Sequence, residues 1–222
     1  MINKVVGSVD EAVADIFDGA VLLCGGFGGR GVPTRLIPAV ARLGVRNLTV
    51  VSNNLGMGKP GDLGELFRNH QVRKACATFP LRPGADAFRE AYERGEVELE
   101  VIPQGTLAER LRAAGAGIGG FYTPTGVDTI LAEGKEVREI DGRLYLFERP
   151  LAGDFALIHA RQADRLGNLR YHRAARNFNP VMAMAGRVTI AEVEELVPVG
   201  ALDPEDVHTP GIFVDRVVVV GR

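Results

Sequence analysis

The chain has 222 residues, of which 46% are hydrophobic, 24% charged and 6% aromatic, and its formal net charge is −2. Such a balance is typical of a globular domain with an aliphatic core, and the even charge offers no electrostatic footprint for nucleic acid. The apolar runs are too short for a membrane span, and MINKVVGSVDEA at the N-terminus has no apolar signal core, so we expect a cytoplasmic protein without membrane or nucleic-acid partners.

The cysteines and histidines give no sign of a metal site. Cys24 and Cys76 are the only cysteines, and they are far apart in the sequence. The four histidines are scattered, with no i,i+4 pair that a helix could present to a metal. We therefore expect no metal, and we expect both cysteines to be small core residues.

The first half of the chain alternates between helical and strand-like patterns. A helix over 5–17 is favoured by its spacing and by Ser8 before Glu11, which resembles a capping box. Further helices are expected over 36–43, 62–70, 85–94 and 106–114, and strands over 20–24, 47–51, 72–78 and 97–102. This alternation predicts a parallel sheet covered by helices on both faces.

The second half has a different pattern. REIDGRLYLF carries Asp141-Gly142 between alternating runs, which is a strong signal for an antiparallel hairpin. FALIHARQADRLGNLRYH predicts a second hairpin that turns near Gly167, and strands are expected over 188–193 and 214–220. The fold class we predict is α/β: one domain over 1–222, with a mostly parallel open sheet and an antiparallel hairpin region in the second half.

A glycine-rich loop follows the first strand, and Gly26, Gly28 and Gly31 match the dinucleotide fingerprint G-x-G-x-x-G. A dinucleotide site also needs an acidic residue at the end of the second strand, where this chain has VSNN. A P-loop is excluded because Val32 and Pro33 stand where Lys and Ser or Thr are required. What remains is either a tight strand-to-helix turn or a loop whose N–H groups approach an anionic ligand.

Neutral amides are expected at the same edge of the sheet. Asn53 and Asn54 follow one parallel strand and Gln104 follows another, and open α/β sheets bind ligands at this edge. An amide orients a carboxylate and leaves it reactive, whereas an arginine would hold it strongly and bidentately. The alternatives are that Gln104 bonds its own backbone and that the asparagines are turn residues.

Several longer motifs resemble one known family. GAVLLCGGFGGRGVP, SNN, PQGTLAERLRAAGAGIGGFYTPTG, LAEGKEVREIDG, ADRLGNLRYH, ARNFNPVMAMA and TIAEVEELV follow, in order, the A (alpha) subunit of family I coenzyme A transferases. The nearest group is similar to succinyl-CoA:3-oxoacid and acetate/acetoacetate CoA transferases. The resemblance covers nearly the whole chain.

This resemblance implies an exchange of CoA between an acyl-CoA and a 3-oxoacid such as acetoacetate, with CoA thioesters as substrates and no permanently bound cofactor. A glutamate of the partner B subunit, in a Ser-Glu-Asn-Gly motif, carries CoA as a thioester. This chain has no such motif, and Glu133 lies in a segment typical of A subunits. A B subunit is therefore expected, in a heterodimer or heterotetramer.

The resemblance also implies which residues form the site. Gln104 is expected to be catalytic, and the substrate-binding residues are expected to be Gly25, Gly26, Phe27, Gly28, Gly31, Asn53 and Asn54. The sequence departs from close 3-oxoacid relatives over 77–84, where they carry a segment like Ser-Tyr-Val-Gly, and it has His159 where a lysine is common. As a lone histidine in an apolar strand, His159 is expected to be a packed core residue.

Two other functions stay open at this stage. A sugar-phosphate isomerase of related architecture would need an Asp/Glu and Lys set at the sheet edge, and the chain has few lysines to supply it. A non-catalytic domain that senses an organic acid would use the glycine loop for reversible binding only. Such a domain would show no transfer activity with any partner.

Overall fold

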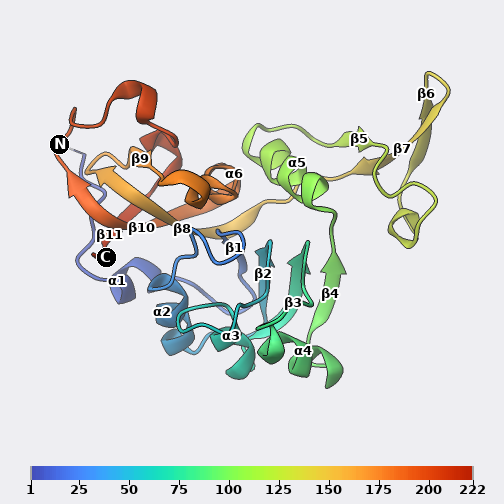
Figure 1. Ribbon diagram of the computed structural model, residues 1–222, viewed down its shortest axis with the longest axis horizontal. Helices are drawn as coiled ribbons and strands as arrows, with labels where there is room; N and C mark the ends of the chain where they lie inside the picture. The colour runs from blue at the N-terminus through green and yellow to red at the C-terminus, as the bar shows by residue number, and fades with distance from the viewer. Residues whose placement is uncertain (1, 222) are drawn as a thin grey trace.

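The computed structural model describes residues 2–221 (Figure 1). Most of the chain surrounds one sheet with the strand order β11-β10-β8-β1-β2-β3-β4, in which all neighbours are parallel, and β9 pairs antiparallel with β8. Its strands are β1 (Val21–Cys24), β2 (Leu48–Ser52), β3 (Val72–Ala77), β4 (Glu98–Val101), β8 (Gly153–Asp164), β9 (Leu169–Arg170), β10 (Gly186–Val197) and β11 (Arg216–Val219). The predicted mostly parallel sheet is confirmed.

Helices cover both faces of this sheet (Figure 1). On one side lie α1 (Val9–Val13), α2 (Leu36–Leu43), α3 (Gly64–Arg68) and α4 (Asp86–Glu93), and on the other lie α5 (Gln104–Gly115) and α6 (Asn179–Ala185). Side chains alternate across a strand, so Leu22 and Cys24 join the core under α1–α4, while Leu23 joins the core under α5 and α6. Short 3₁₀ helices are η1 (Ile130–Ala132), η2 (Arg173–Arg176), η3 (Pro204–Asp206) and η4 (Gly211–Phe213).

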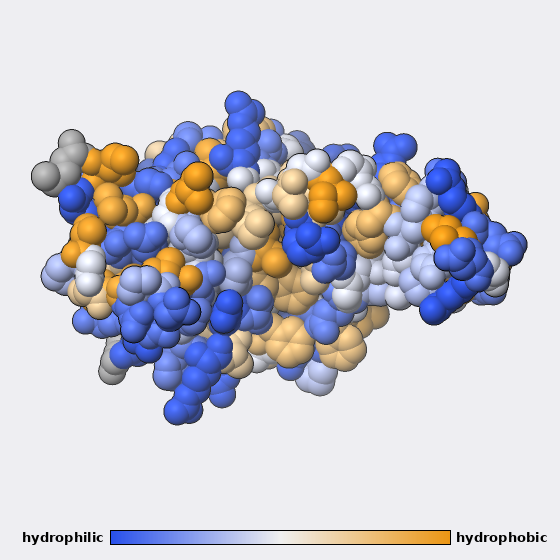
Figure 2. Space-filling view, turned by 90° about the horizontal axis from the view of Figure 1, so that it is seen from above, coloured by the Kyte–Doolittle hydropathy of each residue, from blue (hydrophilic) through white to orange (hydrophobic). Residues whose placement is uncertain are grey.

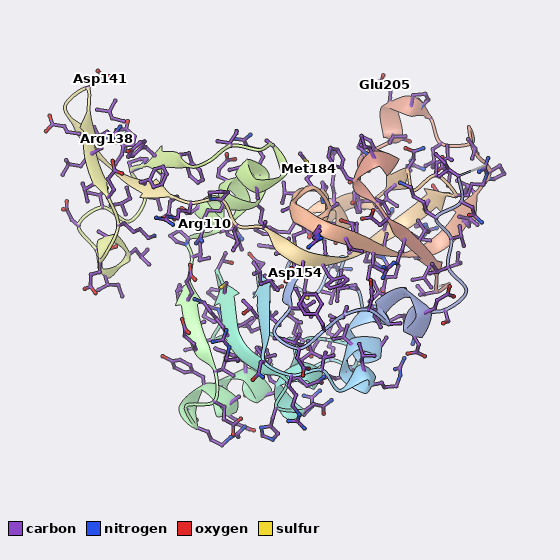
Figure 3. All side chains as sticks on the ribbon, turned by 180° about the vertical axis from the view of Figure 1, so that it is seen from behind. Arg110, Arg138, Asp141, Asp154, Met184 and Glu205 are labelled. Atoms are coloured by element: carbon purple, nitrogen blue, oxygen red, sulfur yellow. The ribbon has the colours of Figure 1, made fainter. Side chains whose placement is uncertain are left out.

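A small lobe projects from the body and consists of β5 (Phe121–Thr123), β6 (Val137–Ile140) and β7 (Arg143–Glu148) in an antiparallel sheet of its own (Figure 1). Asp141 and Gly142 have φ values of 50° and 76°, as a type I′ turn requires, so the predicted hairpin is confirmed. The face of the lobe that is seen in Figure 2 is mostly hydrophilic. The lobe is fixed at its base by Arg110, which donates to Glu100 and to the carbonyl of Arg149, both at 2.9 Å (Figure 3).

Some element boundaries differ from the sequence prediction. The first helix is much shorter than 5–17, because Ser8 caps it by accepting from the N–H of Glu11 at 3.1 Å, and the helix ends after Val13. Before this helix, Val5 pairs with Val217 beside β11. The prediction missed α6 and β5, and β10 is twice as long as the strand expected over 188–193, with 12 residues. No helix in the described part of the chain is long and apolar enough to cross a membrane.

Candidate functional site

A cavity of about 430 Å³ opens beside the glycine loop, at the carboxyl ends of β2 and β3. It is lined by Phe27, Gly28, Asn53, Asn54, Thr78, Phe79, Arg82 and Gln104. Five of these were expected from the sequence: Phe27, Gly28, Asn53, Asn54 and Gln104. They meet because parallel strands end at the same edge, although Gln104 is the first residue of α5 rather than the end of a strand.

The amides in this cavity form a hydrogen-bonded chain. Asn53, which is only 2% exposed, accepts at Oδ1 from Gln104 Nε2 at 2.8 Å and from Thr78 Oγ1 at 2.6 Å. Its Nδ2 donates to Asn54 Oδ1 at 2.8 Å. The side chain of Gln104 thus bonds another site residue rather than its own backbone, and one of its Nε2 hydrogens and its Oε1 remain to meet a ligand.

The glycine loop is closed on itself and joined to this chain of amides. The backbone N–H groups of Phe27 and Arg30 donate to each other's carbonyls at 3.0 Å, and Gly28 donates to Asn54 Oδ1 at 3.0 Å. Gly26 and Gly28 have φ values of 117° and 57°, which favour glycine. Two of the loop N–H groups expected to face a ligand, those of Phe27 and Gly28, are therefore engaged within the chain.

The other predicted loop residues lie elsewhere. The N–H of Gly25 donates to the carbonyl of Leu157 at 2.9 Å. Gly25 and Gly26 line a hollow of about 20 Å³ behind the cavity, which has room for a single water. Gly31 lines a third hollow, of about 560 Å³, together with His159, Arg161 and Glu194. The structure thus does not bring Gly25, Gly26 and Gly31 to the amide cavity.

Asn179, a residue that sequence reasoning did not single out, holds the loop from below. It is fully buried in α6, and its Nδ2 donates to the carbonyls of Gly31 and Ala175 at 3.0 and 2.8 Å. Its Oδ1 accepts from the N–H of His159 at 3.2 Å. A Cβ added at Gly25 would lie 1.9 Å from this oxygen, so a glycine is needed there for packing. The signal in the sequence was an asparagine inside an otherwise apolar helix.

His159 belongs to an ionic cluster rather than to the apolar core expected from the sequence. Its Nδ1 lies 3.1 Å from Glu192 Oε1, and its Nε2 lies 3.5 Å from Glu194 Oε1. Burial lowers the pKa of His159. The hydrogen bond and the charge of Glu192, together with the charge of Glu194, raise it by more, so the pKa in the folded protein lies above its usual value. The other oxygen of Glu192 accepts from the N–H groups of Arg35 and Leu36 at 2.8 and 2.9 Å, and so caps α2.

Both cysteines are buried, as expected. Burial raises the pKa of each thiol to about 12, so neither is a nucleophile at neutral pH. In the described residues, no group of three His, Cys, Asp or Glu side chains is arranged to hold a metal ion.

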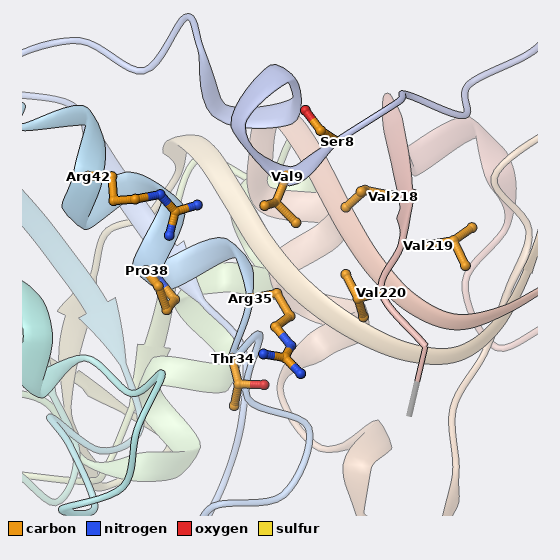
Figure 4. Close-up of a pocket in the computed structure, with 9 residues that line it drawn as sticks. All are labelled: Ser8, Val9, Thr34, Arg35, Pro38, Arg42, Val218, Val219 and Val220. Carbon is orange, nitrogen blue, oxygen red and sulfur yellow. The ribbon is translucent and has the colours of Figure 1, made fainter.

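A further hollow of about 420 Å³ lies between α1, α2 and β11 and contains none of the predicted site residues (Figure 4). Arg35 and Arg42 of the α2 segment face it from one side and Val218–Val220 from the other. Arg42 is paired with Asp10 at 2.6 Å on the surface. The residues that line this hollow, all within 2–221, include no buried side-chain donor that lacks a partner, which distinguishes it from the amide cavity.

The fold is an α/β fold whose cavity, lined by amides, a hydroxyl and a guanidinium, lies at the carboxyl ends of parallel strands, the edge where open α/β sheets bind ligands. The sequence pattern of the coenzyme A transferase family matches residues 6–220. The chain belongs to that family.

Individual relatives agree with this assignment. The chain is 54% identical to the A subunit of the 3-oxoadipate CoA-transferase of Pseudomonas putida, over 99% of this chain and 95% of the relative. It is 51% identical to the A subunit of the probable succinyl-CoA:3-ketoacid coenzyme A transferase of Bacillus subtilis, over 98% and 90% of the two chains.

Among solved structures, an acyl-CoA transferase from Escherichia coli O157:H7, in a thioester complex with CoA, superposes with a TM-score of 0.85 at 26% identity. The match covers 99% of this chain but only 47% of that one, so the chain spans about half of the larger enzyme. The expected family is confirmed, and the isomerase and sensor alternatives are not favoured.

Proposed function

We propose that this chain is the A subunit of a CoA transferase that moves CoA between an acyl-CoA, such as succinyl-CoA, and a 3-oxoacid, such as acetoacetate or 3-oxoadipate. The relatives from Pseudomonas putida and Bacillus subtilis, both A subunits, carry names of these activities. A B subunit completes the enzyme as a heterodimer or heterotetramer. The protein is cytoplasmic, forms one domain over 1–222, and needs no permanently bound cofactor.

One observation carries this proposal: the cavity supplies donors but no nucleophile. Its lining residues, all within 2–221, include neutral amides, a hydroxyl and a guanidinium, and none of them is Asp, Glu, Cys or Lys. The only hydroxyl there, of Thr78, is committed to Asn53. Covalent catalysis at this cavity therefore needs a nucleophile from another polypeptide, and in our proposal the glutamate of the B subunit supplies it.

The chemistry that fits has two exchange steps. The glutamate carboxylate that the B subunit provides attacks the thioester carbonyl of the acyl-CoA, and the C–S bond breaks to release CoA thiolate and an acyl-glutamyl anhydride. The thiolate then attacks the glutamyl carbonyl, which releases the acyl carboxylate and leaves CoA on the glutamate. The acceptor acid reverses both steps. Gln104 and Asn54 orient the acid carboxylate and donate to the oxygen on which negative charge develops.

The test uses this chain by itself, the candidate B subunit by itself, and their mixture, with succinyl-CoA and acetoacetate as substrates. We expect transfer only in the mixture. After incubation with succinyl-CoA, intact-mass measurement should find the CoA adduct only on the B subunit. Glu133→Gln in this chain is a matched control and should leave turnover unchanged. Turnover by this chain without its partner, or a CoA adduct on it, would contradict the proposal.

A further inference from the structure

The amide cavity contains a cationic side chain, that of Arg82, with a donor left unpaired. Arg82 lies in the loop between β3 and α4 and lines the cavity together with Asn54 and Gln104. Its Nε is buried and has no hydrogen-bond partner in the described part of the chain. A buried cationic donor without a partner is unfavourable, and an anion held by the same guanidinium offsets that cost.

The loop that carries Arg82 is attached to the amides at its start. The N–H of Phe79 donates to the carbonyl of Asn53 at 3.0 Å, and the hydroxyl of Thr78 donates to the side chain of Asn53. Asn54 Nδ2 lies 3.4 Å from the carbonyl of Phe79. The backbone of the Arg82 loop and the amides that face the substrate are thus one connected unit.

The end of the same loop is also fixed. The N–H of Ala85 donates to the carbonyl of Arg82 at 3.0 Å, which closes a turn. Gly84, with a φ of 91°, packs so closely on the neighbouring loop that an added Cβ would lie 2.4 Å from the carbonyl oxygen of Met57. The backbone at Arg82 is therefore held beside the amides before any ligand arrives.

The two kinds of donor suit two different carboxylates. The reacting carboxylate must keep its nucleophilicity, which neutral amides allow. A second carboxylate that takes no part in the reaction is best bound by the planar fork of an arginine, through two parallel hydrogen bonds. A cavity of about 430 Å³ is within the usual size of small-molecule sites, so one acid can meet both groups.

We propose that Arg82 binds the remote carboxylate of dicarboxylic substrates, such as succinyl or 3-oxoadipyl groups, and so favours succinate over butyrate, an acid of the same length that has no second polar group. This inference rests on the proposed function and names the substrate class of the same site.

The experiment compares two acceptors that differ only in the second carboxylate, succinate and butyrate, with acetoacetyl-CoA as donor and the enzyme reconstituted from both subunits. We expect wild type to prefer succinate. Arg82→Met should lower kcat/KM for succinate roughly 10- to 100-fold, the loss of one charge-assisted pair, and leave butyrate within about threefold. Arg82→Lys keeps the charge without the fork and should lose less.

The matched control is Arg89→Met, because Arg89 is an exposed arginine of α4 that pairs with Asp86 at 2.5 Å. It should leave both acceptors unchanged. Circular dichroism and size-exclusion chromatography check the folding and assembly of each variant. If Arg82→Met misfolds, the ratio of succinate to butyrate turnover in Arg82→Lys decides the question.

Three outcomes would overturn the inference. Equal loss for both acceptors, or loss of assembly, would mean that Arg82 serves the structure or an acidic residue of the B subunit. Unchanged turnover with both acceptors would mean that Arg82 does not meet the substrate. If wild type transfers CoA to neither acid, the proposed function fails, but the inference about Arg82 can still be tested. Calorimetry then compares the binding of succinate and of butyrate to the wild-type and Arg82→Lys complexes, and an unchanged preference for succinate in Arg82→Lys would contradict the inference.

Discussion

On one side of the glycine loop, a cavity of about 430 Å³ presents neutral amides, whereas on the other side a hollow of about 560 Å³ presents ionised side chains of β8 and β10. On the ionised side the charged groups of β8 and β10 pair with one another: Arg161 pairs with Glu194 at 2.7 Å, and His159 contacts Glu192 and Glu194. On the amide side, donors of Gln104 and Arg82 are left over. The contrast separates ion pairs that join neighbouring elements from unpaired donors, which under our proposal meet the substrate.

Removing the central carboxylate of the ionised side should have the largest effect. Glu192 is 1% exposed and accepts from two N–H groups of α2 and from His159. Glu192→Ala leaves all of these buried donors unpaired, so we expect a loss of about 3 kcal/mol in the free energy of unfolding, measured with urea. Glu195→Ala, at an exposed position of the same strand, should change it by less than about 0.5 kcal/mol. Similar small losses in both variants would contradict the holding role of Glu192.

On the amide side, Gln104→Ala should lower activity rather than stability. The mixture with the B subunit should lose about 100-fold in kcat, as when one donor to a developing charge is removed, and should still assemble. Gln162→Ala is the matched control, because Gln162 donates only to Glu195 on the surface, at 2.9 Å. Unchanged turnover in Gln104→Ala would remove this residue from the reaction.

Asn179 is hydrogen-bonded both to the glycine loop and to His159. Its loss should therefore lower stability and loosen the loop. Asn179→Ala leaves the carbonyls of Gly31 and Ala175 without their side-chain donor, and we expect about 2 kcal/mol of destabilisation. The glycine loop should loosen as well, which amide hydrogen exchange at residues 25–31 can detect. Faster exchange there without faster exchange in α3 and α4 would localise the effect, and uniform exchange would contradict it.

The smallest effect concerns pH. Because the pKa of His159 is raised in the folded protein, its contribution to stability is complete below the unfolded pKa and is lost as the pH rises through the folded value. Glu192 and Glu194 contact it, Arg161 pairs with Glu194, and Arg30, His172 and Arg173 line the same hollow. The stability difference between wild type and His159→Gln should therefore shrink from pH 5 to pH 9 in urea unfolding. A constant or growing difference would show that His159 gains no proton on folding.

Much of the fold could be predicted because strands and helices of a parallel α/β protein have distinct apolar periods and end at glycines. The Asp141-Gly142 pair predicted a hairpin, but nothing local indicated that this hairpin leaves the main sheet. The helix α6 was missed because it is short and because Asn179-Pro180, a pair typical of turns, stands at its start. Proline is tolerated there because it lies in the first turn of the helix.

Only those residues of the candidate site that lie at the ends of strands could be predicted from the sequence. Asn53, Asn54 and Gln104 could be brought together from topology alone. Thr78 and Arg82 could not, because their loop is turned towards the amides by tertiary hydrogen bonds such as that from Phe79 to Asn53. In the same way, only the packing of distant strands shows that Glu192 caps α2.

The close approach of Gly25 to Asn179 makes the residues allowed at two distant positions depend on each other. The φ of Gly25 does not by itself demand glycine; the obstacle to a side chain is the amide oxygen 1.9 Å from the site of its Cβ. An alanine at position 25 is thus tolerated only when position 179 becomes smaller, and a smaller residue there gives up the bonds to Gly31 and Ala175. A library randomised at both positions should recover functional chains chiefly as Gly with Asn, and the two sites should show strong epistasis.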